Sequence, residues 1–400
     1  GLPVPPIDQA DRAEEYSAAA LFVQSARRAQ AGFELEAEEQ LWVVRICQMV
    51  EGMPLGIELA AAWVPVLTCR EIAHEIERGM DFLATTMHDV PERQRSLRAT
   101  FDHSWSLLSA DEREVLCQLA VFQGGFEREA GEQVAGASLP SLLALASKSL
   151  VRRTENGRYD LHEVVRQYAL SHLAEDPQRE AVTRDRHSDF YLALLRDREA
   201  ALKSAAQRET LRELTDENHN LRATWVWAVE RRKFSSIGPA LRCFGWFHDV
   251  RGWHREGIEQ AELGVQALRG SSEDEVRQRV LGQALAQQGL LLFRLGEHDQ
   301  AMFRFEESLS ILRPIADPAL LVDPLIFSGI IMFLGGEFDR AQSFTDECLA
   351  CAQAAGDEWF TAYSLFSQGF IASLVGRYAE GYEQMLAALA IWRGLGDPRY

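Results

Sequence analysis

The chain has 400 residues and a mass of 45.0 kDa, which is too long for one ordinary domain, so we expect two to four folding units. Its 47% hydrophobic and 25% charged residues are typical of a globular protein and exclude a disordered or fibrous one. With 60 acidic and 41 basic side chains, the net charge of -19 disfavours a general polyanion binder, because affinity for phosphate backbones comes from clustered Lys and Arg.

Targeting and redox signals point to a cytoplasmic protein. The sequence has no apolar stretch of about 18 residues, so we predict no membrane span. The first residues lack the basic start and apolar core of a signal peptide, and they lack an initiator Met, so we interpret the chain as a fragment of a longer protein. Six scattered cysteines fit a reducing compartment.

The first region, residues 1–88, is predicted to be a helical domain that follows a short proline-containing segment. Apolar residues recur at helical spacing. The predicted helices cover residues 8–31, 36–50, 57–66 and 71–83. Gly52 and Pro54 separate the second helix from the third, because glycine commonly ends a helix and proline commonly begins one.

Residues 89–178 are predicted to form a winged helix with a small β-hairpin. A first helix at 95–108 is followed by Ser109 and Glu112, which have the spacing of a capping box. Two short helices are expected at 127–134 and 140–148. An Asn-Gly turn at 156–157 between two β-prone runs predicts the hairpin, and a helix at 163–173 closes the unit.

From residue 179 onward the chain is predicted to be helical, with a linker and diverged first repeats at 179–270 and repeats at 271–400. The segment Gly-Glu-His-Asp at 296–299 recurs as Gly-Glu-Phe-Asp at 336–339, and a related segment begins at Gly376, so the period is 40 residues. A helix, a glycine turn and a second helix in each period predict an α-solenoid of tetratricopeptide-like (TPR-like) helix pairs.

Several segments together resemble the NB-ARC branch of the STAND ATPases, the signal-transducing ATPases with numerous domains. The Gly52-Met53-Pro54-Leu55-Gly56 string resembles the GxP segment of that family, and Leu161-His162-Glu163 resembles its Met-His-Asp motif. The string at 220–228 resembles the start of the helical repeats in large LuxR- and SARP-type bacterial regulators. The resemblance implies a lid domain, a winged helix and sensor repeats.

The resemblance also implies a nucleotide site. In that family the proline of the GxP segment packs on adenine, which corresponds to Pro54, and the histidine of the second motif contacts the β-phosphate of ADP, which corresponds to His162. Gly52 belongs to the same segment. The residues alone also allow two simpler interpretations: Pro54 has no role beyond starting a helix, and His162 has no role beyond lying next to a helix N-terminus.

The chain lacks the parts that hydrolysis requires. It contains no GxxxxGK[ST] loop and no apolar strand that ends in paired acids before residue 50. We therefore expect this chain not to be an enzyme by itself, and we expect ADP or ATP to bind in a full-length parent that includes an upstream nucleotide-binding domain.

The repeats are the expected binding region for an inducer ligand or a protein partner. The first helix of each repeat, at about 283–295, 323–335 and 359–375, is expected to line the concave face, where Arg294 is a rare charge. Residues 271–400 hold 18 acidic and 9 basic side chains, which favours a basic or neutral partner.

Two alternatives belong to other classes. A free-standing TPR-like scaffold would use the same repeats without nucleotide control. A DNA-binding winged helix would need Arg, Asn or Gln on its third helix, but the helix at 140–148 offers only one cation, so we expect no direct nucleic-acid binding.

Overall fold

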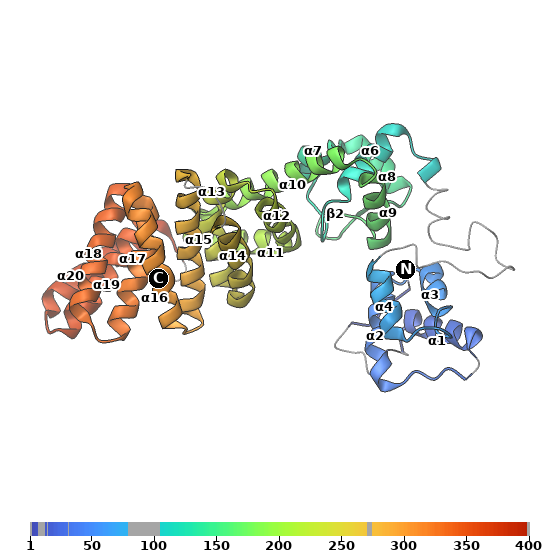
Figure 1. Cartoon of the computed structure of the whole chain (residues 1–400), viewed down its shortest axis with the longest axis horizontal. Coiled ribbons are helices and arrows are strands. Elements are labelled where there is room, and N and C mark those ends of the chain that lie inside the picture. The colour runs from blue at the N-terminus through green and yellow to red at the C-terminus, as the bar shows by residue number, and fades with distance from the viewer. Residues whose placement is uncertain are drawn as a thin grey trace. The chain divides into compact units, whose positions relative to one another are not determined.

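The computed structural model describes residues 2–6, 13, 15–30, 32–78, 105–269 and 274–397. The chain divides into two compact units, residues 1–186 and 187–400 (Figure 1). Both are built from helices, and in the described part of the chain the sheet is a single two-stranded one, so the mainly α fold class is confirmed. The predicted domain borders at residues 88, 178 and 270 stay predictions.

The first unit begins with four helices. They are α1 (Ser17–Ala29), α2 (Ala37–Met49), α3 (Pro54–Ala61) and α4 (Cys69–Arg78). The third helix was wrongly predicted to continue to residue 66: it begins at Pro54 and ends at Ala61, since Pro65 has no N–H to continue the helical bonds. Predicted helical residues 8–12 and 79–83, and most of the helix expected at 95–108, lie outside the described residues.

Four helices and a hairpin follow in the described residues; the two short helices, the hairpin and the closing helix are as predicted, and the first of the four helices begins at the predicted capping box. The helices are α6 (Ala110–Leu119), α7 (Arg128–Ala135), α8 (Leu139–Ser147) and α9 (Glu163–Leu173), and the strands are β1 (Arg152–Arg153) and β2 (Tyr159–Asp160). The predicted capping box is confirmed, since Glu112 N–H donates to Ser109 Oγ at 3.2 Å and Ser109 N–H donates to the Glu112 carboxylate at 2.7 Å. The antiparallel strands pair Arg152 with Asp160.

The second unit continues with helices of the linker and first repeat. These are α10 (Pro177–Arg198), which crosses the border between the units, a short 3₁₀ helix η4 (Ala201–Lys203), α11 (Gln207–Asp216), α12 (Asn218–Glu230), α13 (Phe234–Arg251) and α14 (His254–Arg269). Trp225 and Trp246 are buried in the core of this region. Within the described residues, no helix is both long enough and apolar enough to cross a membrane.

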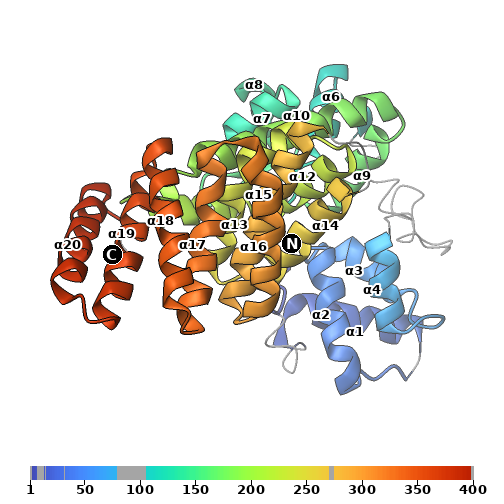
Figure 2. The ribbon, with the colours of Figure 1, turned by 60° about the vertical axis from the view of Figure 1, so that its left-hand side comes forward.

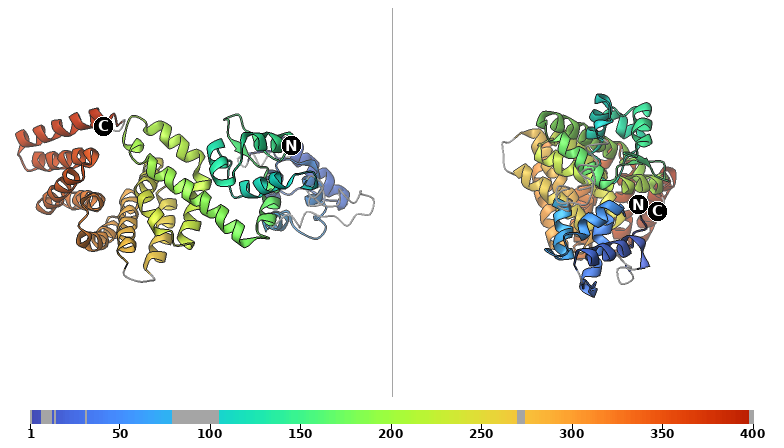
Figure 3. Two further views of the ribbon diagram at one scale, coloured as in Figure 1. Left: turned by 90° about the horizontal axis from the view of Figure 1, so that it is seen from above. Right: turned by 90° about the vertical axis from the view of Figure 1, so that its right-hand side faces the viewer.

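Three helix pairs form the repeat region. They are α15 (Glu275–Arg294) with α16 (His298–Leu312), α17 (Pro318–Leu334) with α18 (Phe338–Ala355), and α19 (Glu358–Leu374) with α20 (Tyr378–Leu395). A short 3₁₀ helix, η5 (Arg313–Ile315), follows α16. Figure 2 shows these pairs one after another, and the left view of Figure 3 shows that they follow a curved path. The helix pairs and their 40-residue period are as predicted.

A glycine in each first helix explains how the pairs pack. Gly289, Gly329 and Gly369 are spaced 40 residues apart and face the second helix of their own repeat. A Cβ atom at Gly289 would lie 2.6 Å from the ring of Phe305, and one at Gly369 would lie 2.8 Å from the carbonyl oxygen of Gly381. The absence of a side chain therefore lets the two helices of a repeat cross closely.

Candidate functional site

The turn between α2 and α3 carries the predicted residues Gly52 and Pro54. Gly52 has φ +68°, and its Cβ position would collide with the backbone of Leu2, whose N–H donates to the Gly52 carbonyl at 2.7 Å. Glycine is required here by both conformation and space. Pro54 is exposed at the first position of α3, so its ring is accessible to a flat ligand.

His162 lies at the N-cap of α9, as predicted for a residue beside a helix start. Its Nδ1 accepts from the backbone N–H of Val164 at 3.3 Å, so the neutral ring carries its proton on Nε2. Burial lowers the pKa of His162 below its ordinary value, against the opposing pull of the Glu51 carboxylate. At neutral pH the side chain is therefore an uncharged Nε2–H donor.

Glu51 joins these two predicted motifs, and the sequence analysis did not single it out. Its carboxylate accepts from Arg152 Nη1 at 2.6 Å and from the backbone N–H of Glu163 at 3.1 Å, and it lies 3.7 Å from His162 Nε2. Glu51 also has a positive φ of 44°, which is uncommon for a residue with a side chain. The feature of the sequence that could have indicated Glu51 is its position directly before Gly52.

The residues of this junction partly fit a nucleotide. An uncharged imidazole N–H, an arginine and the N-terminus of α9 can all donate to a phosphate. The Glu51 carboxylate already accepts from Arg152 Nη1 and from the α9 N-terminus, and Arg152 Nε and Nη2 donate to Asp160, so a phosphate at this point would have to replace Glu51. The accessible ring of Pro54 is compatible with adenine.

The winged-helix surface is not suited to reading bases. The exposed face of α8 presents Leu139, 57% exposed, and Leu143, 69% exposed, one helical turn apart. Lys148, the one cation that follows α8, donates to the Glu112 carboxylate at 2.6 Å. An apolar face with its nearby cation already paired offers no hydrogen-bond code to a major groove.

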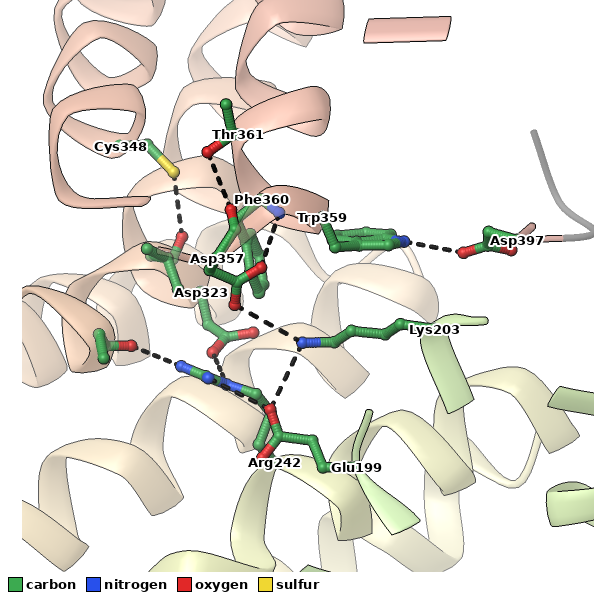
Figure 4. A network of polar contacts seen from close by, with 12 residues as sticks. Glu199, Lys203, Arg242, Asp323, Cys348, Asp357, Trp359, Phe360, Thr361 and Asp397 are labelled. Carbon is green, nitrogen blue, oxygen red and sulfur yellow. Dashed lines mark hydrogen bonds and ion pairs between the residues drawn. The ribbon is translucent and has the colours of Figure 1, made fainter. Parts of the chain in front are cut away.

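A second cluster of charges lies buried in the repeat unit (Figure 4). Arg242 of α13 donates to Asp323 of α17 at 2.8 Å, to the carbonyl of Ala319 at 2.5 Å and to Glu199, in the turn directly after α10, at 3.3 Å. Although burial opposes the charge, the carboxylates of Asp323 and Glu199 raise the pKa of Arg242 above its ordinary value. Arg242 is therefore a permanent cation that joins α13 to α17 and to the turn after α10.

Lys203 of η4 is the second cation of this cluster. Its Nζ lies 3.5 Å from the Glu199 carboxylate and 4.0 Å from that of Asp357, and 4.8 Å from the ring centre of Phe360. The rings of Trp246 and Trp359 also surround the ammonium group. Burial, followed by the charge of Arg242, lowers the pKa of Lys203. No motif in the sequence indicates this cluster, because its members come from parts of the chain that are far apart in sequence.

The first helices of the last two repeats enclose an apolar groove. Its volume is about 180 Å³, and α17 and α19 supply most of its lining. The lining includes Ile330, Phe333, Leu334, Tyr363, Phe366 and Phe370. These residues fall within the ranges 323–335 and 359–375, where the sequence places the binding surface. The groove can take an apolar group, and Leu334 and Phe370 are partly exposed at its edge.

Arg294 is not a lone charge on an apolar face. Its Nε donates to Asp249 Oδ1 at 2.7 Å and its Nη2 donates to Asp249 Oδ2 at 3.0 Å. The guanidinium also lies 5.8 Å from the ring centre of Phe327. The pair joins α13 to α15, and a role for Arg294 in partner binding stays a prediction.

Comparison with known proteins supports a regulatory context. No family model matches the chain. The chain is 32% identical over 342 residues to a Mycobacterium tuberculosis protein named "Putative HTH-type transcriptional regulator", with 80% of this chain and 37% of that protein covered. It is 36% identical over 192 residues to an uncharacterized protein of the same species, with 45% of this chain and 47% of that protein covered. The chain thus spans little more than a third of the regulator that it resembles.

Two solved structures show weaker similarity. A STAND protein with a tetratricopeptide repeat sensor from Pyrococcus horikoshii is 16% identical, with a TM-score of 0.31 over 94% of this chain and 60% of that chain. Aspartyl phosphate phosphatase F from Bacillus subtilis is 11% identical, with a TM-score of 0.41 over 96% of this chain and 76% of that chain. Scores this low do not establish a shared fold, so the fold rests on the helices described above.

Proposed function

We propose that this chain is the regulatory and sensor part of a nucleotide-controlled switch that takes part in transcriptional regulation. Its helical lid and winged helix would hold ADP in the resting state, together with a P-loop domain of the same longer protein. Its TPR-like repeats would bind an inducer or protein partner, and that binding would shift the protein toward its active, assembled state.

One observation carries the nucleotide half of the proposal. Glu51 connects the turn of Gly52 to the helix start at His162, so the two segments expected to touch opposite ends of ADP already meet through a carboxylate. A carboxylate that accepts from a helix N-terminus and from Arg152 occupies the position suited to a phosphate. Displacement of Glu51 by a phosphate would couple nucleotide binding to the contact between lid and winged helix.

The apolar groove between α17 and α19 supports the sensor half. It combines aromatic side chains with a partly open edge, which suits an apolar side chain of a protein partner or an apolar part of a small inducer. The free-standing scaffold would use the same groove. A P-loop in the longer protein favours the switch, whereas its absence favours the scaffold.

The test measures the ADP that stays bound to the purified full-length protein. We expect wild type to retain ADP and His162→Ala to lose it and become active without inducer. Phe370→Ala, at the edge of the groove, is the matched variant: it should retain ADP but respond poorly to inducer. Full ADP retention by His162→Ala, with normal dependence on inducer, would contradict the proposed role of the lid and winged helix.

A further inference from the structure

A polar pocket lies between α11 and the C-terminal end of α13, away from the apolar groove. Its volume is about 680 Å³. The polar and charged residues in its lining are Gln207, Arg208, Arg212, Thr215, Asp216 and Arg251. Three guanidinium groups therefore face one carboxylate across this pocket, in a chain whose net charge is -19.

The three arginines are exposed and available. Arg208 and Arg212 are four residues apart and so lie on one face of α11. Within the described residues neither has a hydrogen bond or an ion pair, and Arg251 has only a contact with the ring of Trp253, at 4.8 Å from its centre.

α11 carries the acidic residues Glu209, Glu213 and Asp216, and Glu213 already has a partner outside the pocket. The Glu213 carboxylate accepts two hydrogen bonds from Arg198, at 2.6 and 2.7 Å. Elsewhere in the repeat unit, Arg313 forms a bidentate pair with Glu347, and Arg269 donates from Nη2 to both carboxylate oxygens of Glu307. In this pocket, by contrast, Arg208, Arg212 and Arg251 form no ion pair within the described residues, although the Asp216 carboxylate also belongs to the lining.

Guanidinium groups bind phosphoryl and carboxylate groups through two parallel hydrogen bonds. Neighbouring guanidinium groups repel one another, and a bound anion offsets this repulsion. The pocket has the volume of a small-molecule site. A long nucleic acid would instead meet the acidic surface of the rest of the chain. We propose that this pocket binds a compact polyanion, a small molecule with at least two phosphoryl or carboxylate groups. This site is independent of the nucleotide switch.

The experiment is isothermal titration of the 400-residue chain with pyrophosphate and, separately, with citrate, at constant ionic strength. We expect saturable one-site binding of at least one of them. Arg208→Gln and Arg212→Gln should each weaken it by about tenfold or more, because each removes hydrogen bonds between charged groups. Preference for pyrophosphate would identify a phosphoryl ligand, and preference for citrate would identify a carboxylate ligand.

The matched control is Arg340→Gln, which removes an exposed arginine of α18 outside the pocket and should leave the affinity unchanged. Circular dichroism should show equal helix content in all variants, because the substituted side chains are exposed. If a pocket variant loses helix, Arg208→Lys provides the second test, since it keeps the charge and should weaken binding only partly. The proposal is overturned by failure of both anions to saturate, by equal loss of affinity in the control, or by tighter binding of a single-stranded oligonucleotide.

Discussion

The molecule contains two clusters in which carboxylates and cations join segments that are distant in sequence, and the two differ in burial. At the lid–wing junction, Glu51 binds Arg152, which is 101 residues away and 54% exposed. In the repeat unit, Arg242 binds Asp323, which is 81 residues away, and the two side chains are 17% and 3% exposed. The chemistry is the same, but water reaches only the first cluster freely.

This difference separates a contact that can switch from one that fixes the fold. An exposed ion pair exchanges its partner for water or another anion at little cost, and contributes about 0–1 kcal/mol. A buried charge that loses its partner has no such replacement, and breaking a buried pair costs about 3–5 kcal/mol. The Glu51 contact is therefore suited to opening, whereas the Arg242 cluster is suited to keeping α13, α17 and the turn after α10 in register.

The largest effect is expected for Arg242→Met, which leaves the buried Asp323 carboxylate without the cation that it binds. We expect the free energy of unfolding of the repeat unit to fall by about 3–5 kcal/mol. Differential scanning calorimetry of the whole chain measures the loss, and hydrogen exchange by mass spectrometry should place it in α13 and α17.

The control is Arg269→Met, which breaks an exposed ion pair with Glu307 in the same unit. Its expected cost is about 1 kcal/mol or less. Equal destabilisation by the two substitutions would show that burial does not distinguish the clusters.

A smaller effect is expected for Glu51→Gln at the lid–wing junction. The amide oxygen can still accept from the Glu163 N–H, but the ion pair with Arg152 is lost, so the expected cost is about 1 kcal/mol or less. Local opening should nevertheless increase, and we expect faster hydrogen exchange in the α2–α3 turn and at the start of α9. Unchanged exchange at both segments would mean that other contacts hold the lid and the winged helix together.

The sequence was sufficient to predict the elements because their signals are local. The capping box at Ser109, the Asn-Gly turn of the hairpin and the 40-residue glycine period each depend on residues close together in the chain. The error in α3 also has a local cause, since Pro65 was present in the predicted range and its effect on the helix was not weighed.

The sequence was insufficient for contacts that only the folded chain creates. His162 was singled out, but Glu51 was not, because 112 residues separate Glu51 from its partner Glu163. Arg294 was read as an isolated charge because Asp249 belongs to an earlier helix. The bulk charge of -19 likewise gave no sign of the arginines that converge at α11, since a local excess of cations is hidden in a total.

The smallest effect concerns pH and His162. Burial lowers the pKa of His162 in the folded chain below the ordinary value of 6.5, so the folded state takes up this proton less readily than the unfolded state. The contribution of the neutral His162 side chain to the free energy of unfolding is therefore complete above pH 6.5, and it is lost as the pH falls through the lowered pKa of the folded state.

The variant His162→Asn keeps an N-cap acceptor for α9 but cannot titrate. Above pH 7 we expect the unfolding midpoints of wild type and His162→Asn to change with pH in the same way. Below pH 6.5 we expect the free energy of unfolding of wild type to fall more steeply than that of the variant, by at most about 1.4 kcal/mol per pH unit. If the unfolding midpoints of the two proteins instead change in the same way from pH 8 to pH 5, protonation of His162 does not destabilise the folded state. The protonated imidazole would then contact water or the Glu51 carboxylate in the folded chain.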